Sequence, residues 1–157
     1  MKPKILVLNG SNLNMLGVRE PHIYGHDTLA DIGTRLQARA KELGLDVEMR
    51  QSNSEAELVT WIQEARSTCA GIVINPAAYT HTSVAVLDAL LLSELPVIEL
   101  HLSNPHRRDE FRHRSFVSRA AKGIVCGFGA HGYELALEAM AKLVKDAAGG
   151  KKAANKT

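Results

Sequence analysis

Short apolar runs alternate along the chain with segments in which apolar residues recur every three or four positions. The runs predict buried strands, and the recurring positions predict helices with one apolar face. The predicted strands are residues 4–9, 45–50, 71–75, 96–100 and 123–126. The predicted helices are residues 28–43, a helix that starts from a capping box at residues 54–57, residues 82–93 and residues 133–147.

The order of these elements predicts an α/β fold. Strands that are joined by helices pair in parallel, and right-handed crossovers place the helices on both faces of the sheet. Five strands within 157 residues suit a flavodoxin-like three-layer sandwich with the parallel strand order 2-1-3-4-5. We therefore expect a single domain over residues 1–148. The remaining residues, 149–157, are polar and led by two glycines, and we expect this tail to be disordered.

Composition and charge narrow the classes of function. The sequence has no run of about 20 apolar residues and no signal-peptide core, so we expect a cytoplasmic protein with no membrane partner. The net charge is only +2, which argues against a general polyanion binder. Two cysteines cannot form a disulfide scaffold, and the polar loops lack the ligand spacing of a metal site.

Polar residues gather after the first, third and fourth predicted strands, at the edge where an open parallel sheet binds its ligands. The first connection, residues 10–27, far exceeds the usual length of about two to six residues, which is typical of a lid or a binding loop. The connection after residue 100 holds four arginines against two carboxylates. Arginine favours a small anion because its guanidinium can donate two hydrogen bonds to one carboxylate. The first turn matches neither a dinucleotide-binding nor a P-loop pattern.

Several separated motifs resemble type II 3-dehydroquinate dehydratase, and the similarity extends from about residue 4 to residue 145. Two positions depart from the family pattern: Ser11 stands where proline is usual, and Ala77 where glycine is common. These departures affect loop rigidity rather than the chemistry. The motifs are Asn9-Gly10-Ser11-Asn12-Leu13-Asn14, Leu16-Gly17, Arg19-Glu20-Pro21, Ile23-Tyr24-Gly25, Gln51-Ser52-Asn53-Ser54-Glu55, Asn75-Pro76, Tyr79-Thr80-His81-Thr82-Ser83, Glu99-Leu100-His101-Leu102-Ser103-Asn104 and Phe111-Arg112.

The resemblance implies a carbon–oxygen hydro-lyase that needs no cofactor and no metal. The implied reaction is the anti elimination of water from 3-dehydroquinate through an enolate, which gives 3-dehydroshikimate. This is the third step of the shikimate pathway to chorismate and the aromatic amino acids. Residues 1–148 are then a single catalytic domain, and the implied assembly is a homododecamer built as a tetramer of trimers.

The resemblance also implies a role for each site residue. Tyr24 is the catalytic base, and Arg19 activates it. His101 is the general acid that protonates the departing hydroxyl group, and Glu99 orients it. Asn12 helps to stabilise the enolate, through a water molecule. The implied substrate-binding residues are Asn75, His81, Leu102, Ser103, Arg112 and Asp88, the last from a neighbouring subunit, with Arg108 as a lid-side arginine.

Other interpretations of the same residues remain open. Tyr24 can pack at a turn, Asn12 can serve the turn alone, and Asp88 can be an exposed carboxylate. A receiver or flavin-binding module has the same strand order, but asparagines rather than carboxylates stand at the strand ends, and the first turn has one hydroxyl group. A nucleic-acid binder could use the arginines of residues 107–114, but two carboxylates interrupt them and no aromatic platform accompanies them, so no nucleic-acid partner is expected.

Overall fold

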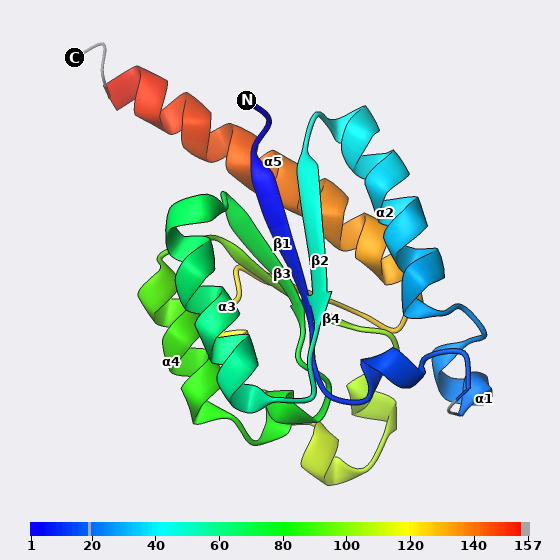
Figure 1. Cartoon of the computed structure of the whole chain (residues 1–157). Coiled ribbons are helices and arrows are strands. Elements are labelled where there is room, and N and C mark those ends of the chain that lie inside the picture. Colours follow the sequence, from blue (N-terminus) through cyan, green and yellow to red (C-terminus); the bar gives the residue numbers. More distant parts are fainter. Residues whose placement is uncertain (19, 155–157) are drawn as a thin grey trace.

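The computed structural model of the chain describes residues 1–18 and 20–154. Five parallel strands form one sheet in the order β2-β1-β3-β4-β5, which confirms the predicted α/β fold (Figure 1). The strands are β1 (Lys4–Asn9), β2 (Asp46–Gln51), β3 (Gly71–Asn75), β4 (Val97–His101) and β5 (Gly123–Cys126). The helices are α1 (Pro21–Tyr24), α2 (Leu29–Leu43), α3 (Glu55–Thr68), α4 (Val84–Ser93) and α5 (His131–Ala154).

Helices cover both faces of the sheet, α2 and α5 on one and α3 and α4 on the other (Figure 1). Successive side chains of a strand point to opposite faces. Ile5 and Val7 of β1 therefore join the core under α2 and α5, whereas Leu6 and Leu8 join the core under α3 and α4. A central strand that is covered on both faces needs apolar residues at every position, so its sequence is a continuous apolar run. The sequence pattern therefore located β1 correctly.

Hydroxyl side chains cap the amino ends of α2 and α3. The Thr28 hydroxyl accepts from the Asp31 backbone N–H at 3.2 Å, and the Asp31 carboxylate accepts from the Thr28 N–H at 3.0 Å, which completes a capping box. The capping box predicted at residues 54–57 is only half formed. Ser54 accepts from the Glu57 N–H at 3.2 Å, but the Ser54 N–H donates to the hydroxyl of Ser52 at 3.0 Å rather than to Glu57.

Helix α5 is longer than predicted at both ends. It spans His131–Ala154, so residues 149–154 are helical where the sequence predicted a disordered tail. Glycine in a helix costs about 1 kcal/mol relative to alanine, which is why the Gly149–Gly150 pair suggested an end. The neighbouring alanines and lysines are strong helix formers and carry the helix past the sheet (Figure 1). The rest of the predicted tail, residues 155–157, lies outside the described residues.

The turns after β1 and β3 meet where the strand order reverses. Asn9 pairs in register with Asn75, and the Gly10 N–H donates to the Asn75 carbonyl at 2.8 Å. A Cβ atom on Gly10 would collide with the backbone carbonyl of Pro76, so only glycine allows this approach. The connections that leave β1, β3 and β4 therefore start from one edge of the sheet, as expected for a ligand site in this fold.

Of the two departures from the family pattern, the one at Ala77 has a clear consequence for the backbone. It opens a short 3₁₀ turn, η2 (Ala77–His81), with φ at 53°, in the left-handed region. A residue with a Cβ atom is strained there, and glycine is not. We expect Ala77→Gly to raise the free energy of unfolding by about 0.5–1 kcal/mol, after allowing for the greater chain entropy of unfolded glycine.

Urea unfolding of the two proteins measures this difference. Ala78→Gly is the matched control, because Ala78 follows in the same turn with an ordinary negative φ, and we expect glycine to destabilise the protein there. Loss of stability in both variants would contradict the assignment of strain to Ala77.

None of the described helices is both long enough and apolar enough to cross a membrane.

Candidate active site

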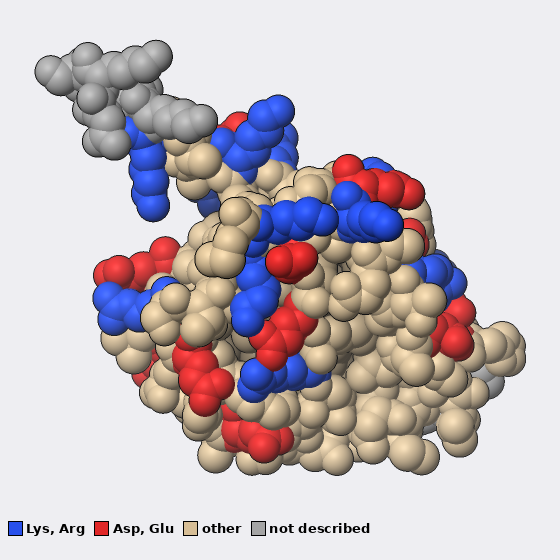
Figure 2. All heavy atoms as spheres, turned by 45° about the horizontal axis from the view of Figure 1, so that its top comes forward, with Lys and Arg blue, Asp and Glu red and all other residues tan. Residues whose placement is uncertain are grey.

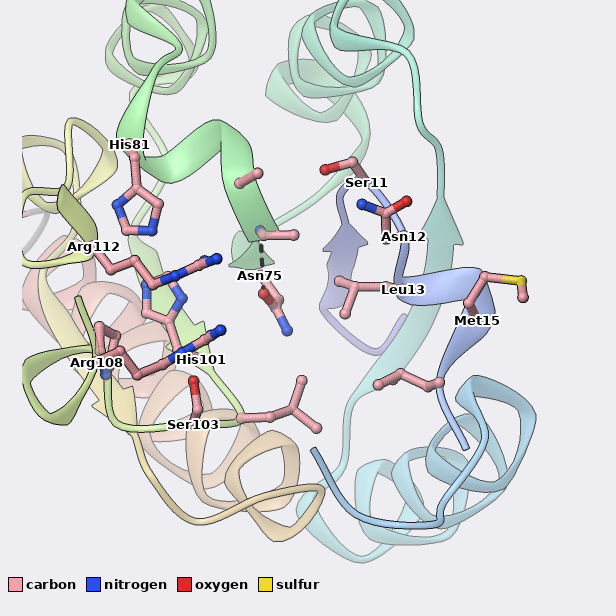
Figure 3. A pocket seen from close by; sticks show the side chains of 15 residues that line it. Ser11, Asn12, Leu13, Met15, Asn75, His81, His101, Ser103, Arg108 and Arg112 are labelled. Carbon is pink, nitrogen blue, oxygen red and sulfur yellow. Dashed lines mark hydrogen bonds between the residues drawn. The ribbon is translucent and has the colours of Figure 1, made fainter. Parts of the chain in front are cut away.

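A pocket opens at the carboxyl ends of β1, β3 and β4 (Figure 3). Its empty volume is about 760 Å³ with the open mouth included, a size that suits one small molecule. The three loops that leave these strands form its wall. Of the residues singled out in the sequence, the pocket brings together Asn12, Asn75, His81, His101, Leu102, Ser103, Arg108 and Arg112.

The two sides of the pocket differ in chemistry, as Figure 3 shows. The basic side chains, His81, His101, Arg108 and Arg112, lie together on one side. The loop after β1 forms the opposite side with apolar, amide and hydroxyl side chains, namely Leu13, Met15, Asn12 and Ser11. No acidic residue is among the described residues that line the pocket. The arrangement therefore favours an anion whose carbon skeleton can rest against an apolar wall.

The Arg112 side chain can supply a buried hydrogen-bond donor to a ligand in the pocket. Its Nε atom is buried and makes no hydrogen bond within the described part of the chain. A buried N–H group without an acceptor costs about 1–3 kcal/mol, so the protein keeps such a group where a ligand supplies the acceptor. The guanidinium also lies 4.9 Å from the ring centroid of Phe111. Because Arg112 lines the pocket, a bound carboxylate or hydroxyl group is the natural acceptor.

His101 and Glu99 form a buried pair at the end of β4. They stand two residues apart, so both side chains project from the same face of the strand. The His101 Nε2 atom lies 2.6 Å from Glu99 Oε2, and Glu99 is only 2% exposed. Burial raises the pKa of Glu99, but hydrogen bonds from His101, Ser118 and Ser115 outweigh it and hold the pKa below its ordinary value. An ionised Glu99 accepts from Nε2, which leaves Nδ1 of His101 as the ring nitrogen available to a ligand.

The protein holds His81 at the other ring nitrogen, Nδ1, whereas it holds His101 at Nε2. Its Nδ1 atom lies 2.7 Å from the Arg114 carbonyl oxygen, which can only accept, so Nδ1 must carry a proton. Burial lowers the pKa of His81 and outweighs that hydrogen bond, and the positive charges of His101 and Arg112 act in the same direction as burial. The neutral ring then offers Nε2 as an acceptor. His81 is thus suited to bind a hydroxyl group, and His101 to donate a proton.

Asn75 is fixed by a buried network below the pocket. Its Nδ2 atom donates to the Tyr133 hydroxyl oxygen at 3.1 Å, and Tyr133 donates to Asn9 Oδ1 at 2.6 Å. Burial raises the pKa of Tyr133 well above its ordinary value, so the phenol stays a donor. The Asn75 Oδ1 atom accepts from the Ala77 N–H at 3.3 Å. The Tyr133 hydroxyl group therefore sets the orientation of both amides, a role that the sequence analysis did not identify.

Other predicted site residues do not line this pocket. Glu99 lies behind His101, and Asp88 is exposed on α4, away from the pocket of its own chain. Arg19 lies outside the described residues, and for Tyr24 the structure describes the backbone at the end of α1 and not the side chain. The sequence analysis missed the apolar part of the wall, because isolated apolar residues in a loop show no periodicity. These residues are Leu13, Met15, Leu16, Ala77, Ala78 and Pro105.

No group of three or more His, Cys, Asp or Glu side chains is arranged to hold a metal ion in the described ranges, residues 1–18 and 20–154. The fold and the pocket together define an acid–base enzyme that acts on a small polar anion at the switch point of a flavodoxin-like sheet. The family model for class II dehydroquinase matches residues 3–141. The chain belongs to this family, the type II 3-dehydroquinate dehydratases, which are hydro-lyases of the shikimate pathway.

Relatives and solved structures agree with this assignment. The chain is 61% identical over 148 residues to "3-dehydroquinate dehydratase 2" of Pseudomonas putida, covering 94% of this chain and 99% of that protein. It is 58% identical over 145 residues to the 3-dehydroquinate dehydratase of Phenylobacterium zucineum, covering 92% and 100%. The crystal structure of type II dehydroquinase from Propionibacterium acnes superposes with a TM-score of 0.87 at 49% identity, covering 90% of this chain and 98% of that one.

Proposed function

We propose that this pocket converts 3-dehydroquinate to 3-dehydroshikimate by anti elimination of water through an enolate. The observation that carries the proposal is that the buried Glu99 carboxylate holds His101 on the wall of an arginine-lined pocket. A base removes a proton from the carbon beside the ketone, and the C–H electron pair forms the enolate. The enolate then expels the hydroxyl group, which takes a proton from His101 and leaves as water. The step balances as loss of water, with no oxidation or reduction.

The catalytic roles are proposed on the family motifs. Tyr24 removes the proton, and Arg19 stabilises its phenolate. His101 is the general acid, and Glu99 keeps its ring oriented. Asn12 stabilises the enolate through a water molecule, which its place on the pocket wall supports.

The substrate-binding roles are also proposed on the family motifs, and the place of these residues on the pocket wall supports them. The backbone N–H groups of Leu102 and Ser103 and the Ser103 hydroxyl bind the substrate carboxylate. Arg112, Asn75 and His81 bind the ring hydroxyl groups. For His81 this means accepting a hydrogen bond at Nε2, because Nδ1 already donates to Arg114. Arg108 acts as a lid-side arginine that helps to enclose the substrate.

We also propose a cytoplasmic homododecamer, a tetramer of trimers in which Asp88 reaches the pocket of a neighbouring subunit. Asp88 is exposed on a face of α4 that also exposes three large apolar side chains, which supports contact with another protein surface. These side chains are Val84, Leu91 and Leu92. Basic and acidic side chains are interspersed on the face drawn in Figure 2, which supports the absence of a nucleic-acid partner on that face.

An absorbance assay tests the function directly. Purified protein mixed with 3-dehydroquinate is expected to generate the absorbance of a conjugated enone. Borohydride treatment with substrate should leave the activity intact, because the three pocket loops, residues 10–27, 76–83 and 102–114, contain no lysine that could form an imine with the ketone. No growth in absorbance would reject the proposed function, and inactivation by borohydride would reject the enolate mechanism.

The effect of Asn12 on turnover can be separated from its effect on the turn. Its backbone is left-handed, with φ at 67°, so Asn12→Ala would strain the turn as well as remove the amide. Asn12→Gly removes the amide and tolerates the same φ. We expect Asn12→Gly to lower kcat by about 10² with a much smaller change in KM, because the amide acts on the enolate rather than on bound substrate.

Steady-state kinetics and a thermal unfolding curve are measured on the same Asn12→Gly preparation. If kcat stays within about threefold of wild type while the fold is unchanged, Asn12 serves only the turn.

A further inference from the structure

Two serines outside the pocket converge on the carboxylate behind His101. Ser118 donates from its hydroxyl to Glu99 Oε1 at 2.7 Å, and Ser115 donates to the same oxygen at 2.9 Å. The other carboxylate oxygen, Oε2, is the partner of His101. Each oxygen of this buried carboxylate is therefore held by the protein, and the serines occupy the side away from the histidine.

The hydroxyl groups of this network all donate toward Glu99. Ser115 has a single hydroxyl proton and gives it to Glu99, so it can only accept from Thr80, 3.1 Å away, and from the Ser118 N–H at 3.2 Å. Thr80 must then be the donor to Ser115. Hydrogen bonds that are aligned in one direction polarise one another, so the chain from Thr80 through Ser115 strengthens the donation to Glu99.

The segment that carries these serines is tied to the pocket at several points. The Phe116 N–H donates to the Thr80 carbonyl at 2.8 Å, and the Arg114 carbonyl holds His81. Residues 114–118 are therefore linked to both pocket histidines, to His81 by a direct hydrogen bond and to His101 through Glu99. A displacement of this segment would change both at once.

We propose that Ser115 and Ser118 are positioning residues, whose hydroxyl groups keep Glu99 ionised and aimed at His101 so that His101 retains the proton that it delivers. This inference rests on the proposed function for its catalytic consequence, but the hydrogen-bond geometry that carries it does not. Their contribution to the lowered pKa of Glu99 supports the same conclusion.

Other charged or titratable groups around this pair are left untouched by a serine substitution. The groups that face the pair line either the pocket or a second hollow behind His101, which Ser115 and Ser118 also line. They are His81 of η2, the loop residues Arg108 and Arg112, and Cys126 of β5. His106 and His113 also line that hollow. A change confined to Ser118 therefore reports on the serine–carboxylate contact and not on the surrounding charge.

The test uses the full chain and two readouts, one of which needs no substrate. In Ser118→Ala we expect the proton on His101 Nε2, followed by NMR in the free protein at neutral pH, to exchange with water about tenfold faster than in wild type, because Glu99 is held less firmly. We expect kcat to fall about tenfold, with KM within about twofold, because loss of one supporting hydrogen bond removes only part of the roughly 10²–10⁴ that a positioned general acid contributes. Ser115→Ala combined with Ser118→Ala should increase both effects.

Two further variants separate positioning from a merely structural role. Ser118→Thr keeps the hydroxyl group at this half-buried position, so both readouts should return toward wild type. Ser93→Ala removes another buried serine hydroxyl, which bonds the Leu90 carbonyl on α4, and should change neither readout. Lower thermal stability in Ser118→Ala with unchanged proton exchange and kcat would overturn the proposal. A wild-type protein without dehydratase activity would defeat the proposed function, whereas the proton exchange would still decide this inference.

Discussion

Replacing His101 by glutamine is expected to lower kcat by about 10³ and to change KM little. Proton transfer from a positioned group contributes about 10²–10⁴ to a rate. Nε2 of His101 already donates to Glu99, so the proton that His101 delivers is a second one, carried on Nδ1. His81 cannot substitute for it, because its Nδ1 proton is held by the Arg114 carbonyl and burial keeps its pKa low. Glutamine preserves a polar group that can contact Glu99, so the fold should be retained.

Isotope exchange shows which step of the reaction the substitution affects. If His101 acts only after the enolate has formed, His101→Gln should still exchange the substrate proton beside the ketone with D₂O while product formation is slow. Mass spectrometry of recovered substrate measures the exchange. Equal loss of exchange and of product formation would mean that His101 acts in proton abstraction, contrary to its proposed role. Glu99→Gln is the companion variant, with an expected loss smaller than that of His101→Gln.

Some parts of this site could be predicted because one strand carries them. Glu99 and His101 lie two residues apart on β4, and the two-residue period of a strand places them on the same face. The predicted strand ended at residue 100, one residue before the observed end. This error did not affect the expectation that Glu99 and His101 lie on the same face. The ends of the first and third strands were also expected at one edge of the sheet, and Asn9 indeed pairs in register with Asn75.

Other parts could not be predicted, because they depend on contacts between distant loops. Ser115 and Ser118 lie in a connection of short 3₁₀ turns with no helical or strand period, so the sequence did not indicate which hydroxyl faces Glu99. The role of Tyr133 depends on the meeting of α5 with the ends of β1 and β3. The left-handed backbone of Ala77 was not predicted either, since alanine is an unfavourable residue for that conformation.

Tyr24→Phe is expected to lower kcat by about 10³ or more, because it removes the proposed base. An ordinary phenol has a pKa of about 10, so roughly one molecule in 10³ is ionised at pH 7. Lowering a phenol pKa by about three units requires about 4 kcal/mol of differential stabilisation. One arginine about 4 Å away supplies about 1 kcal/mol in water, but about 4 kcal/mol at an effective dielectric constant near 20. Arg19 can therefore activate Tyr24 only in a site from which water is largely excluded.

The pH dependence of kcat distinguishes the base from its activator. In Arg19→Gln the phenol ionises at higher pH, so the acid limb of the kcat profile should move upward while Tyr24→Phe stays inactive across the range. Tyr79→Phe is the matched control, since its hydroxyl donates to the Asn53 carbonyl at 2.6 Å and Tyr79 does not line the pocket. Its kcat should stay within about twofold of wild type, because it takes no part in proton transfer. If Tyr24→Phe retained more than about a tenth of wild-type turnover, another group would have to be the base, because loss of a general base commonly costs at least about 10².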